Sequence, residues 1–424
     1  MKLLYLVLDG AADRLVDKPT SYEVAKKPSL DSLAKKSKGG MVFTIARGIA
    51  PESDAAVLSI LGYDPHKQYT GRGPIEALGA GIRIREEYEV AFRANFATVD
   101  DSGRRIIDRR CGRTLTSEEA KELAKSVEYI NLGKYDAYAK VVATVGHRAV
   151  VVIGSDKYKL SGNVGNTDPA YRKEGPISVA VKSYEPVVAS CVPLDDSPEA
   201  KRTAELANIF TKKVFEALKD HRVNIERKKR GLLPANMILL RDAGNKLPKV
   251  PPISELYSGK KFSAIAEMPV EKGIARLTQM SVAEVDLLPD KRKEYSIMLD
   301  KTLTLLREND VVYVHLKGPD EPGHDGEFKR KVESIELIDE CFIKPLIEKI
   351  DLSKIAILVT SDHATPYSVK AHTDDPVPFI VYSPNITPDG LSLFSEKECF
   401  CKGSLGLIDH GWMLLKRIFQ IIER

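Results

Sequence analysis

A chain of 424 residues is longer than a single hydrophobic core usually grows, so we expect two domains. Its 43% hydrophobic and 29% charged residues are typical of a globular protein, and no stretch approaches the roughly 20 apolar residues that span a membrane. The formal net charge of +4 is too small to predict a nucleic-acid-binding protein, although it suits an enzyme that handles anions. Five cysteines without a C-x-x-C pair indicate free thiols and a cytoplasmic location.

Several apolar, β-branched runs stop abruptly at polar residues: LLYLVL (3–8), VVYVHL (311–316), IAILVTS (355–361) and PFIVYS (378–383). Because these runs are continuously apolar, they predict strands that are covered on both faces, as in a parallel sheet flanked by helices. Residues 329–350 have apolar positions at helical spacing and predict a crossover helix. The expected fold class is α/β, with a mostly parallel sheet in a core formed by residues 1–82 and 232–424.

Residues 83–231 differ from the rest of the chain. Short β-type runs alternate there with turn residues, and a helical pattern follows at 197–222. The basic run RKKRG (227–231) lacks interleaved aromatics, so we interpret it as a solvated helix end or linker and not as a nucleic-acid patch. This segment predicts an inserted, smaller α+β domain.

Metal-type ligands follow three of the strand-like runs. They are three aspartates and three histidines: Asp9, Asp320, His324, Asp362, His363 and, nine residues further on, His372. In open α/β sheets, ligands bind outside the carboxyl ends of the strands, so we expect these side chains to converge. Carboxylates and imidazoles without a thiolate suit Mn²⁺, Zn²⁺ or a similar ion, and this set is large enough for two ions.

Each of these residues also has a purely structural interpretation. Asp9 alone could cap a helix, Asp362-His363 could form a turn, and His372 could be an ordinary surface histidine. Their repeated placement at strand ends favours the metal site. Three other histidines fit no such pattern and are interpreted as structural: His66, His221 and His315.

The stretch GIAPESDAAVLSILGY (48–63) places Ser53 directly before a helical run. Backbone N–H groups and the helix dipole favour a bound phosphate at such a position. A pair of ions beside Ser53 would activate its hydroxyl as a nucleophile in phosphoryl transfer. Locally, Ser53 could equally be a plain helix N-cap, and only the metal-type ligands elsewhere favour the nucleophile.

Together these motifs resemble the archaeal type of cofactor-independent (2,3-bisphosphoglycerate-independent) phosphoglycerate mutase, in the alkaline phosphatase superfamily. The matching motifs span nearly the whole chain: VLDG (7–10), PESDAAVLSILGYDP (51–65), YTGRGPIEALGAGI (69–82), HLKGPDEPGHDG (315–326), IELIDECFIKPL (335–346), TSDHATP (360–366) and AHTDDPVPF (371–379). The resemblance implies an alkaline-phosphatase-like core and an isomerase of glycolysis and gluconeogenesis.

The resemblance also implies two metal ions, each with its own residues: Asp9, Ser53, Asp362 and His363 for one, and Asp320, His324 and His372 for the other. Ser53 is the implied nucleophile and becomes a phosphoserine while 3-phosphoglycerate is converted to 2-phosphoglycerate. Mn²⁺ is the expected ion, with Zn²⁺, Co²⁺ or Mg²⁺ as alternatives, and 2,3-bisphosphoglycerate is not required. We expect a small phosphorylated substrate and no nucleic-acid or membrane partner, and the oligomeric state stays open.

A phosphorylated carboxylate needs a cationic site, and the fork of an arginine binds either of its anionic groups in bidentate fashion. We expect four residues to act as a group: Arg110, Arg113, Arg148 and Lys272. Lys272 is included because its segment is similar to one whose lysine touches phosphate in related mutases. Asp168 or His147 is the expected acid/base on the glycerate hydroxyls.

Two rival functions stay open. The same metal and serine core also serves metal-dependent phosphatases and other phosphoryl-transfer enzymes, because fold does not fix substrate. A non-enzymatic protein that binds anions or nucleic acid through a degenerate site is the second rival, and the complete ligand set argues against it.

Overall fold

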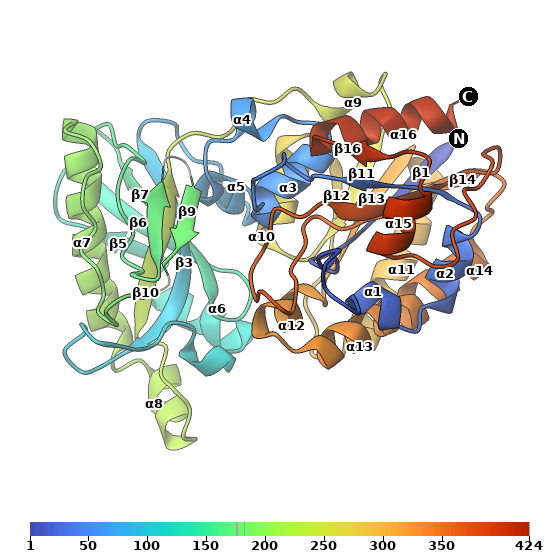
Figure 1. Cartoon of the computed structure of the whole chain (residues 1–424). Coiled ribbons are helices and arrows are strands. Elements are labelled where there is room, and N and C mark those ends of the chain that lie inside the picture. The colour runs from blue at the N-terminus through green and yellow to red at the C-terminus, as the bar shows by residue number, and fades with distance from the viewer. Residues whose placement is uncertain (175–176, 182, 424) are drawn as a thin grey trace. The chain divides into compact units, whose positions relative to one another are not determined.

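The computed structural model describes residues 1–174, 177–181 and 183–423, and the chain divides into two compact units (Figure 1). The first unit comprises Met1–Gln68, Val250–Glu267 and Ile274–Arg424. The second unit comprises Tyr69–Lys249 and Met268–Gly273. Among the described residues, no helix has the length and apolar character that a bilayer crossing needs.

An eight-stranded sheet forms the centre of the first unit (Figure 1). In spatial order its strands are β12 (Ser281–Glu284), β11 (Phe262–Ala266), β13 (Val311–Leu316), β1 (Lys2–Leu8), β14 (Ile355–Thr360), β15 (Val377–Tyr382), β2 (Lys38–Val42) and β16 (Leu407–Ile408). Neighbours from β12 to β14 are parallel, and β15 runs antiparallel to β14 and β2. Every residue of β13 and β14 is buried, as continuously apolar runs predict. The predicted α/β class with a mostly parallel sheet is confirmed.

Helices flank this sheet. They are α1 (Ser21–Val24), α2 (Pro28–Ala34), α3 (Ser53–Ile60), α4 (Pro65–Gln68), α9 (Ile253–Leu256), α11 (Lys291–Glu308), α12 (Asp320–Asp325), α13 (Phe328–Ile338), α14 (Lys344–Lys349), α15 (Glu396–Lys402) and α16 (Leu414–Ile422). Helix α11 packs against β11 and β13, whereas α2 and α15 contact β15. The predicted crossover helix is present as α13 and α14, with a π-helical turn at Asp339–Ile343 between them. Pro345 follows this turn at the start of α14, where its missing N–H prevents a regular helical bond.

The second unit is built on an antiparallel sheet. Its strands, in spatial order, are β10 (Met237–Gly244), β3 (Glu89–Val99), β7 (Arg148–Ser155), β6 (Ala137–Ala143) and β5 (Tyr129–Asn131), and β4 (Ile106–Asp108) pairs with β3. A separate hairpin joins β8 (Tyr171–Glu174) and β9 (Ile177–Ala180), and the helices are α5 (Arg72–Gly79), α6 (Ser117–Ser126), α7 (Pro198–Leu218) and α8 (Arg222–Lys229), with α10 (Pro269–Leu277) beginning in this unit. Phe92, Phe96 and Phe210 belong to a core between one sheet face and the helices α6 and α7. Ala91 and Val150 pack with Ala77 of α5 on the other face.

The second unit is larger than the predicted inserted segment of residues 83–231. Helix α5, which the prediction assigned to the core, packs against β3, β7 and β10. Strand β10, also assigned to the core, pairs antiparallel with β3. An apolar run predicts a buried strand but carries no information about which sheet the strand joins. The boundaries in the structure therefore fall at Tyr69 and Lys249.

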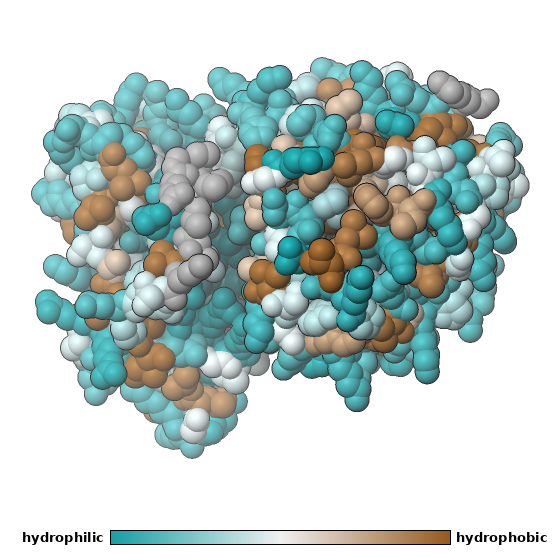
Figure 2. All heavy atoms as spheres, in the orientation of Figure 1, coloured by the Kyte–Doolittle hydropathy of each residue, from teal (hydrophilic) through white to brown (hydrophobic). Residues whose placement is uncertain are grey.

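Most apolar residues of the two units are buried in the interior of their unit. Figure 2 shows hydrophilic side chains over most of the face in view, interrupted by smaller hydrophobic areas. Polar groups that are fully buried are therefore exceptions that need a physical reason, and several of them lie at one edge of the first sheet.

Candidate metal centre and active site

Three neighbouring strands of the first sheet bring distant residues to a common edge. Strand β1 lies between β13 and β14 and pairs in parallel with both. Asp9 follows β1, Lys317 follows β13 and Asp362 follows β14. Because parallel strands end at the same edge of a sheet, these residues meet although they are far apart in sequence.

Asp9, Asp362 and His363 form what we define as the first group. All three are buried, and one potential ligand atom from each lies within 4.8 Å of the others. His363 Nε2 is 3.2 Å from Asp362 Oδ2 and 3.6 Å from Asp9 Oδ1. Two carboxylates and one imidazole with this spacing are a donor set that suits a divalent ion.

In the first group, one carboxylate oxygen of each aspartate has hydrogen-bond or ion-pair partners and the other accepts no hydrogen bond from the described residues. Asp362 Oδ1 accepts from the backbone N–H groups of Gly10 and His363, at 3.0 and 3.1 Å, and Lys317 Nζ is 3.1 Å from Asp9 Oδ2. Within the described residues, the buried atoms Asp9 Oδ1 and Asp362 Oδ2 have no hydrogen-bond partner. Burying a carboxylate oxygen without a partner is costly, so the arrangement fits a cation between these atoms.

Two further residues lie against the first group: His315, which the sequence had suggested is only structural, and Lys317, which no sequence pattern singled out. His315 Nε2 is 3.5 Å from Asp9 Oδ1 and 3.7 Å from Asp362 Oδ2, and Lys317 pairs with Asp9. Burial alone would raise the pKa of Asp9, but Lys317 and then His315 hold that pKa well below its ordinary value. The carboxylate is therefore ionised and ready to bind a cation. His315 lies within an apolar strand, where no sequence signal marks it.

Ser53 lies beside the first group. It is the first residue of α3, and Glu52 occupies the N-cap position, so Ser53 is not the N-cap. Its Oγ is 3.1 Å from His363 Nε2, and the side chain is half-buried. The hydroxyl thus lies next to both a helix N-terminus and a carboxylate-imidazole group, which suits an oxygen that attacks a phosphate.

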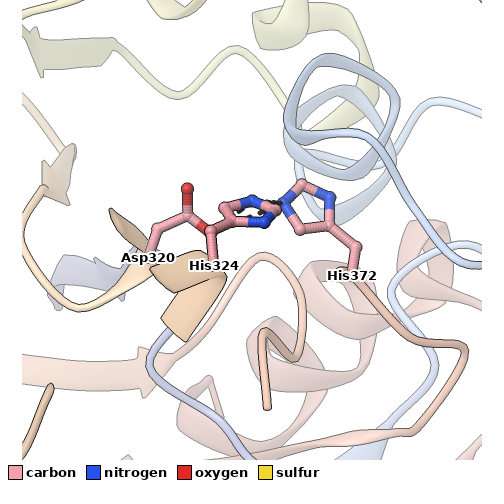
Figure 3. A group of neighbouring side chains, drawn as sticks. All are labelled: Asp320, His324 and His372. Atoms are coloured by element: carbon pink, nitrogen blue, oxygen red, sulfur yellow. Dashed lines mark hydrogen bonds and ion pairs between the residues drawn. The ribbon is translucent and has the colours of Figure 1, made fainter. Parts of the chain in front are cut away.

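Asp320, His324 and His372 form what we define as the second group, and Figure 3 shows their three side chains. Asp320 begins helix α12, and His324 lies one helical turn further on the same side of that helix. Asp320 Oδ1 is 3.5 Å from His324 Nε2 and 3.4 Å from His372 Nε2. The two imidazoles point their Nε2 atoms at each other across 3.1 Å (Figure 3).

The partners of the second group determine which imidazole nitrogens carry hydrogen. His372 Nδ1 is 2.7 Å from the carbonyl oxygen of Pro51, and His324 Nδ1 is 3.3 Å from that of Lys370. A carbonyl oxygen only accepts, so in each ring Nδ1 is the donor and Nε2 is left with a lone pair in the neutral form. Backbone bonds of this kind orient histidines that bind metals. Both Nε2 atoms are therefore positioned to bind one ion.

The charges of the second group follow from the mutual effect of Asp320 and His372. Burial lowers the pKa of His372, but the neighbouring Asp320 outweighs this and raises it to about 9. Burial and the neighbouring Asp9 raise the pKa of Asp320. His372 and His363 lower this pKa by a larger amount, so the net shift is downward. The ionised carboxylate of Asp320 thus lies against a protonated His372. A divalent ion that binds His372 Nε2 would displace the proton from that nitrogen.

The two groups lie next to each other. The rings of His363 and His372 are stacked with their centroids 3.7 Å apart, and an antiparallel bridge pairs Ala364 with Thr373. Gly10 permits this approach, because a Cβ there would lie 2.6 Å from Asp320 Oδ1. Its φ of +57° also favours glycine. The glycine of VLDG is therefore required by close packing.

In the second unit, three arginines lie on one face of the sheet, which we call the arginine face: Arg93, Arg148 and Arg241. Arg241 is directly opposite Arg93, and Arg148 is directly opposite Asn95, two residues further along β3. Directly paired residues, and residues two apart in a strand, point to the same side of a sheet. Neighbouring strands therefore present three guanidinium groups side by side.

Two carboxylates, Glu76 and Asp242, pair with arginines at this face. Arg72 Nε and Arg93 Nε lie 2.7 and 3.3 Å from the same oxygen, Glu76 Oε1. Asp242 Oδ2 is 3.9 Å from both Arg93 and Arg241. Burial, and then the neighbouring Arg241 and Arg72, lower the pKa of Arg93 to about 10. The repulsion between these neighbouring guanidinium groups favours a bound anion.

Of the residues predicted in the second unit, Arg148 belongs to this face. Burial lowers the pKa of His147 to about 3, and the positive charges of Arg148, Arg110, Arg241 and Arg113 lower it further. Asp168 is held through both oxygens by Arg109, at 2.7 and 2.5 Å.

Tyr171 links Asp168 to the arginine face. Its ring lies 5.1 Å from the guanidinium carbon of Arg109 and 4.1 Å from that of Arg241. Lys272 is half-buried on α10. Arg72, Arg109 and Arg241 were not predicted from the sequence, because a single arginine in a helix, turn or strand looks like an ordinary surface charge.

Comparison with known proteins identifies related chains. A family described as 2,3-bisphosphoglycerate-independent phosphoglycerate mutase matches residues 34–224. A 2,3-bisphosphoglycerate-independent phosphoglycerate mutase of Aeropyrum pernix is 44% identical and covers 100% of both chains, and one of Archaeoglobus fulgidus is 41% identical over 96% of this chain and 94% of its own. The solved cofactor-independent phosphoglycerate mutase of Thermoplasma acidophilum is 32% identical with a TM-score of 0.60 over 100% of both chains. A Pyrococcus horikoshii protein is 28% identical with a TM-score of 0.76, over 100% of this chain and 97% of its own.

Proposed function

The chain belongs to the family of 2,3-bisphosphoglycerate-independent phosphoglycerate mutases, and from this premise we propose that it interconverts 3-phosphoglycerate and 2-phosphoglycerate through a phosphoserine at Ser53. The observation that carries the proposal is the 3.1 Å contact between Ser53 Oγ and His363 Nε2, at the edge of the first group. A nucleophile beside a buried carboxylate-imidazole group is what phosphoryl transfer to a serine requires.

The proposed metal ligands follow from the two groups. The first group, with Ser53, holds one divalent ion, and the second group holds the other. The buried oxygens of Asp9 and Asp362 and the lone pairs on His324 and His372 support this assignment. When bound, such ions supply positive charge that lowers the pKa of a nearby hydroxyl and neutralises a phosphate. We propose Mn²⁺, because oxygen and imidazole ligands without sulfur suit it.

The chain's own residues then divide the work. Ser53 Oγ forms a bond to phosphorus while the bond to the 3-oxygen of glycerate breaks, and the reverse steps at the 2-oxygen return the phosphoryl group. The amide groups at the start of α3 favour the phosphate charge near Ser53. Lys317 holds Asp9 in its ionised form. No 2,3-bisphosphoglycerate is needed, because the serine carries the phosphoryl group between the two oxygens.

We assign substrate binding to the second unit as a substrate domain. Its arginine face, with Arg110 and Arg113, supplies the cations for carboxylate and phosphate, and Lys272 supplies a further one. His147 is a poor proton acceptor with a pKa of about 3, which leaves Asp168 as the proposed group that moves protons on the glycerate hydroxyls. The five cysteines are free, which fits a cytoplasmic enzyme.

A direct assay tests the mutase. The full-length chain is incubated with Mn²⁺ and 3-phosphoglycerate, and both 2-phosphoglycerate and inorganic phosphate are measured. Formation of 2-phosphoglycerate without phosphate supports the proposal, whereas release of phosphate alone indicates a phosphatase. Absence of any turnover, with or without metal, indicates a binding protein.

A matched pair of variants tests the nucleophile. Ser53→Ala should abolish turnover and the incorporation of phosphate into the protein, because the variant lacks the hydroxyl that is proposed to attack phosphorus. Ser59→Ala changes a serine in the same helix α3, on a different face, and should keep most of the activity. Equal activity in the two variants would contradict the role of Ser53.

A further inference from the structure

Thr365 lies between the two groups and contacts both. It follows His363 by two residues and is fully buried. Its Oγ1 is 2.9 Å from His363 Nδ1 in the first group and 2.7 Å from Asp320 Oδ1 in the second. A single hydroxyl therefore joins the two sets of proposed ligands.

The direction of these bonds follows from the chemistry of the partners. The Thr365 hydroxyl has one hydrogen and donates it to Asp320 Oδ1. At the contact with His363 the hydroxyl oxygen must then accept, and Nδ1 carries the hydrogen. His363 Nε2 is left with its lone pair, and it is this nitrogen that faces Asp9, Asp362 and Ser53. Thr365 thus selects the tautomer of His363 that can bind a cation in the first group.

The backbone of Thr365 is fixed independently of its side chain. Its N–H donates to the carbonyl oxygen of Ala12 at 3.1 Å, and its carbonyl oxygen accepts from Lys331 Nζ at 2.8 Å. Lys331 is fully buried and also binds Ala12 O at 3.0 Å and Asp13 Oδ1 at 2.7 Å. Removing the hydroxyl alone therefore leaves the loop held in place.

We propose that Thr365 is a positioning residue for both metal sites at once, through its single hydroxyl. It fixes the tautomer and ring orientation of His363 in the first group and the carboxylate orientation of Asp320 in the second. The inference rests on the proposed function, in which each group holds a divalent ion. Outer partners of this kind typically change metal affinity by about 10–100-fold when they are removed.

The test measures metal binding and not turnover. Mn²⁺ is titrated calorimetrically into the full-length chain after removal of metal by a chelator. Thr365→Val keeps the shape without the hydroxyl, and Thr365→Ser keeps the hydroxyl. Each variant is combined with Asp9→Asn, which disables the first group, and separately with His372→Ala, which disables the second.

We expect Thr365→Val to weaken Mn²⁺ binding by about 10–100-fold in both backgrounds. Thr365→Ser should stay within a few-fold of its parent, and chelator-treated chains should unfold at similar denaturant concentrations. Weakening in only one background would overturn the shared role, and equal loss in Thr365→Ser would assign the effect to packing of the methyl group. Unchanged affinity in Thr365→Val, with two ions bound by the wild-type chain, would refute this inference alone. A wild-type chain that binds no ion would refute the proposed function as well.

Discussion

Lys331 offers a quantitative test of how the loops at the site are held. Its ammonium group is fully buried and donates three hydrogen bonds, to Ala12 O, Asp13 Oδ1 and Thr365 O, at 3.0, 2.7 and 2.8 Å. Ala12 follows the proposed ligand Asp9, and Thr365 follows His363, so Lys331 ties together the loops after β1 and β14. Lys331→Met replaces the side chain with an apolar one of similar length and removes all three bonds.

The magnitude follows from what is left behind. Removing one partner of a buried ion pair costs about 3–5 kcal/mol, because the other charge stays buried. Asp13 Oδ2 keeps the backbone N–H of Ser21 at 2.6 Å, but Asp13 Oδ1 and the two carbonyl oxygens lose a charged donor. We therefore expect the first unit to lose about 3–5 kcal/mol. At roughly 2–4 °C per kcal/mol for a unit of this size, its melting temperature should fall by about 6–20 °C.

The assay is thermal and urea unfolding of the chelator-treated chain, followed by circular dichroism, so that metal binding does not contribute. Lys329→Met, two residues earlier in α13, is the matched control. Lys329 is 90% exposed and its Nζ is 4.0 Å from Glu333, so its loss should cost no more than about 0.5 kcal/mol. If Lys331→Met and Lys329→Met unfold at the same midpoint, the buried lysine does not hold the loops and the reasoning is refuted.

Three further changes have expected outcomes. Burial, and then Asp13, raise the pKa of Glu396 from 4.5 to about 7, so the folded chain binds this proton more tightly than the unfolded chain. The unfolding free energy should then fall by up to about 3 kcal/mol as pH rises from about 4.5 to 7. Urea titrations at pH 5 and pH 7.5 should show a smaller dependence on pH for Glu396→Gln. An unchanged pH dependence in that variant would exclude Glu396 as its source. Gly10→Ala places a Cβ 2.6 Å from Asp320 Oδ1 and should weaken Mn²⁺ binding at the second group by calorimetry, with wild-type affinity as the contrary result. Arg241→Met should raise KM for 3-phosphoglycerate at least tenfold while Mn²⁺ affinity stays constant, and an unchanged KM would remove Arg241 from the substrate site.

The sequence predicts the first sheet better than the second unit. Runs such as VVYVHL are buried along their whole length. Burial on both faces of a strand requires a continuously apolar run, and such a run can be recognised in the sequence. The membership of β10 is not local. Its apolar residues suit either sheet, and only pairing with β3 decides between them. The spacing of apolar residues therefore does not predict where one unit ends and the other begins.

The candidate site divides in the same way. Asp9 and Asp362 stand out because each directly follows an apolar run, Asp320 stands out in the loop after a third run, and parallel pairing brings such strand ends together. His315 and Thr365 do not stand out. His315 sits inside a buried strand, and a threonine two residues after His363 has no distinctive spacing. Their contacts with the two groups depend on strand register and loop packing, which a single sequence does not display.

The two groups differ in how far the folded chain satisfies them, and this difference bears on the position of the nucleophile. In the second group, Asp320 Oδ1 accepts from Thr365 and lies 3.4 Å from His372 Nε2. In the first group, Asp9 Oδ1 and Asp362 Oδ2 are buried without a hydrogen bond among the described residues. A buried carboxylate oxygen without a hydrogen bond is destabilising, so a cation between Asp9 Oδ1 and Asp362 Oδ2 would lower the free energy of the folded chain. Ser53 lies against the first group, and positive charge bound there would also stabilise the negative charge that develops when a phosphoryl group is transferred to this hydroxyl.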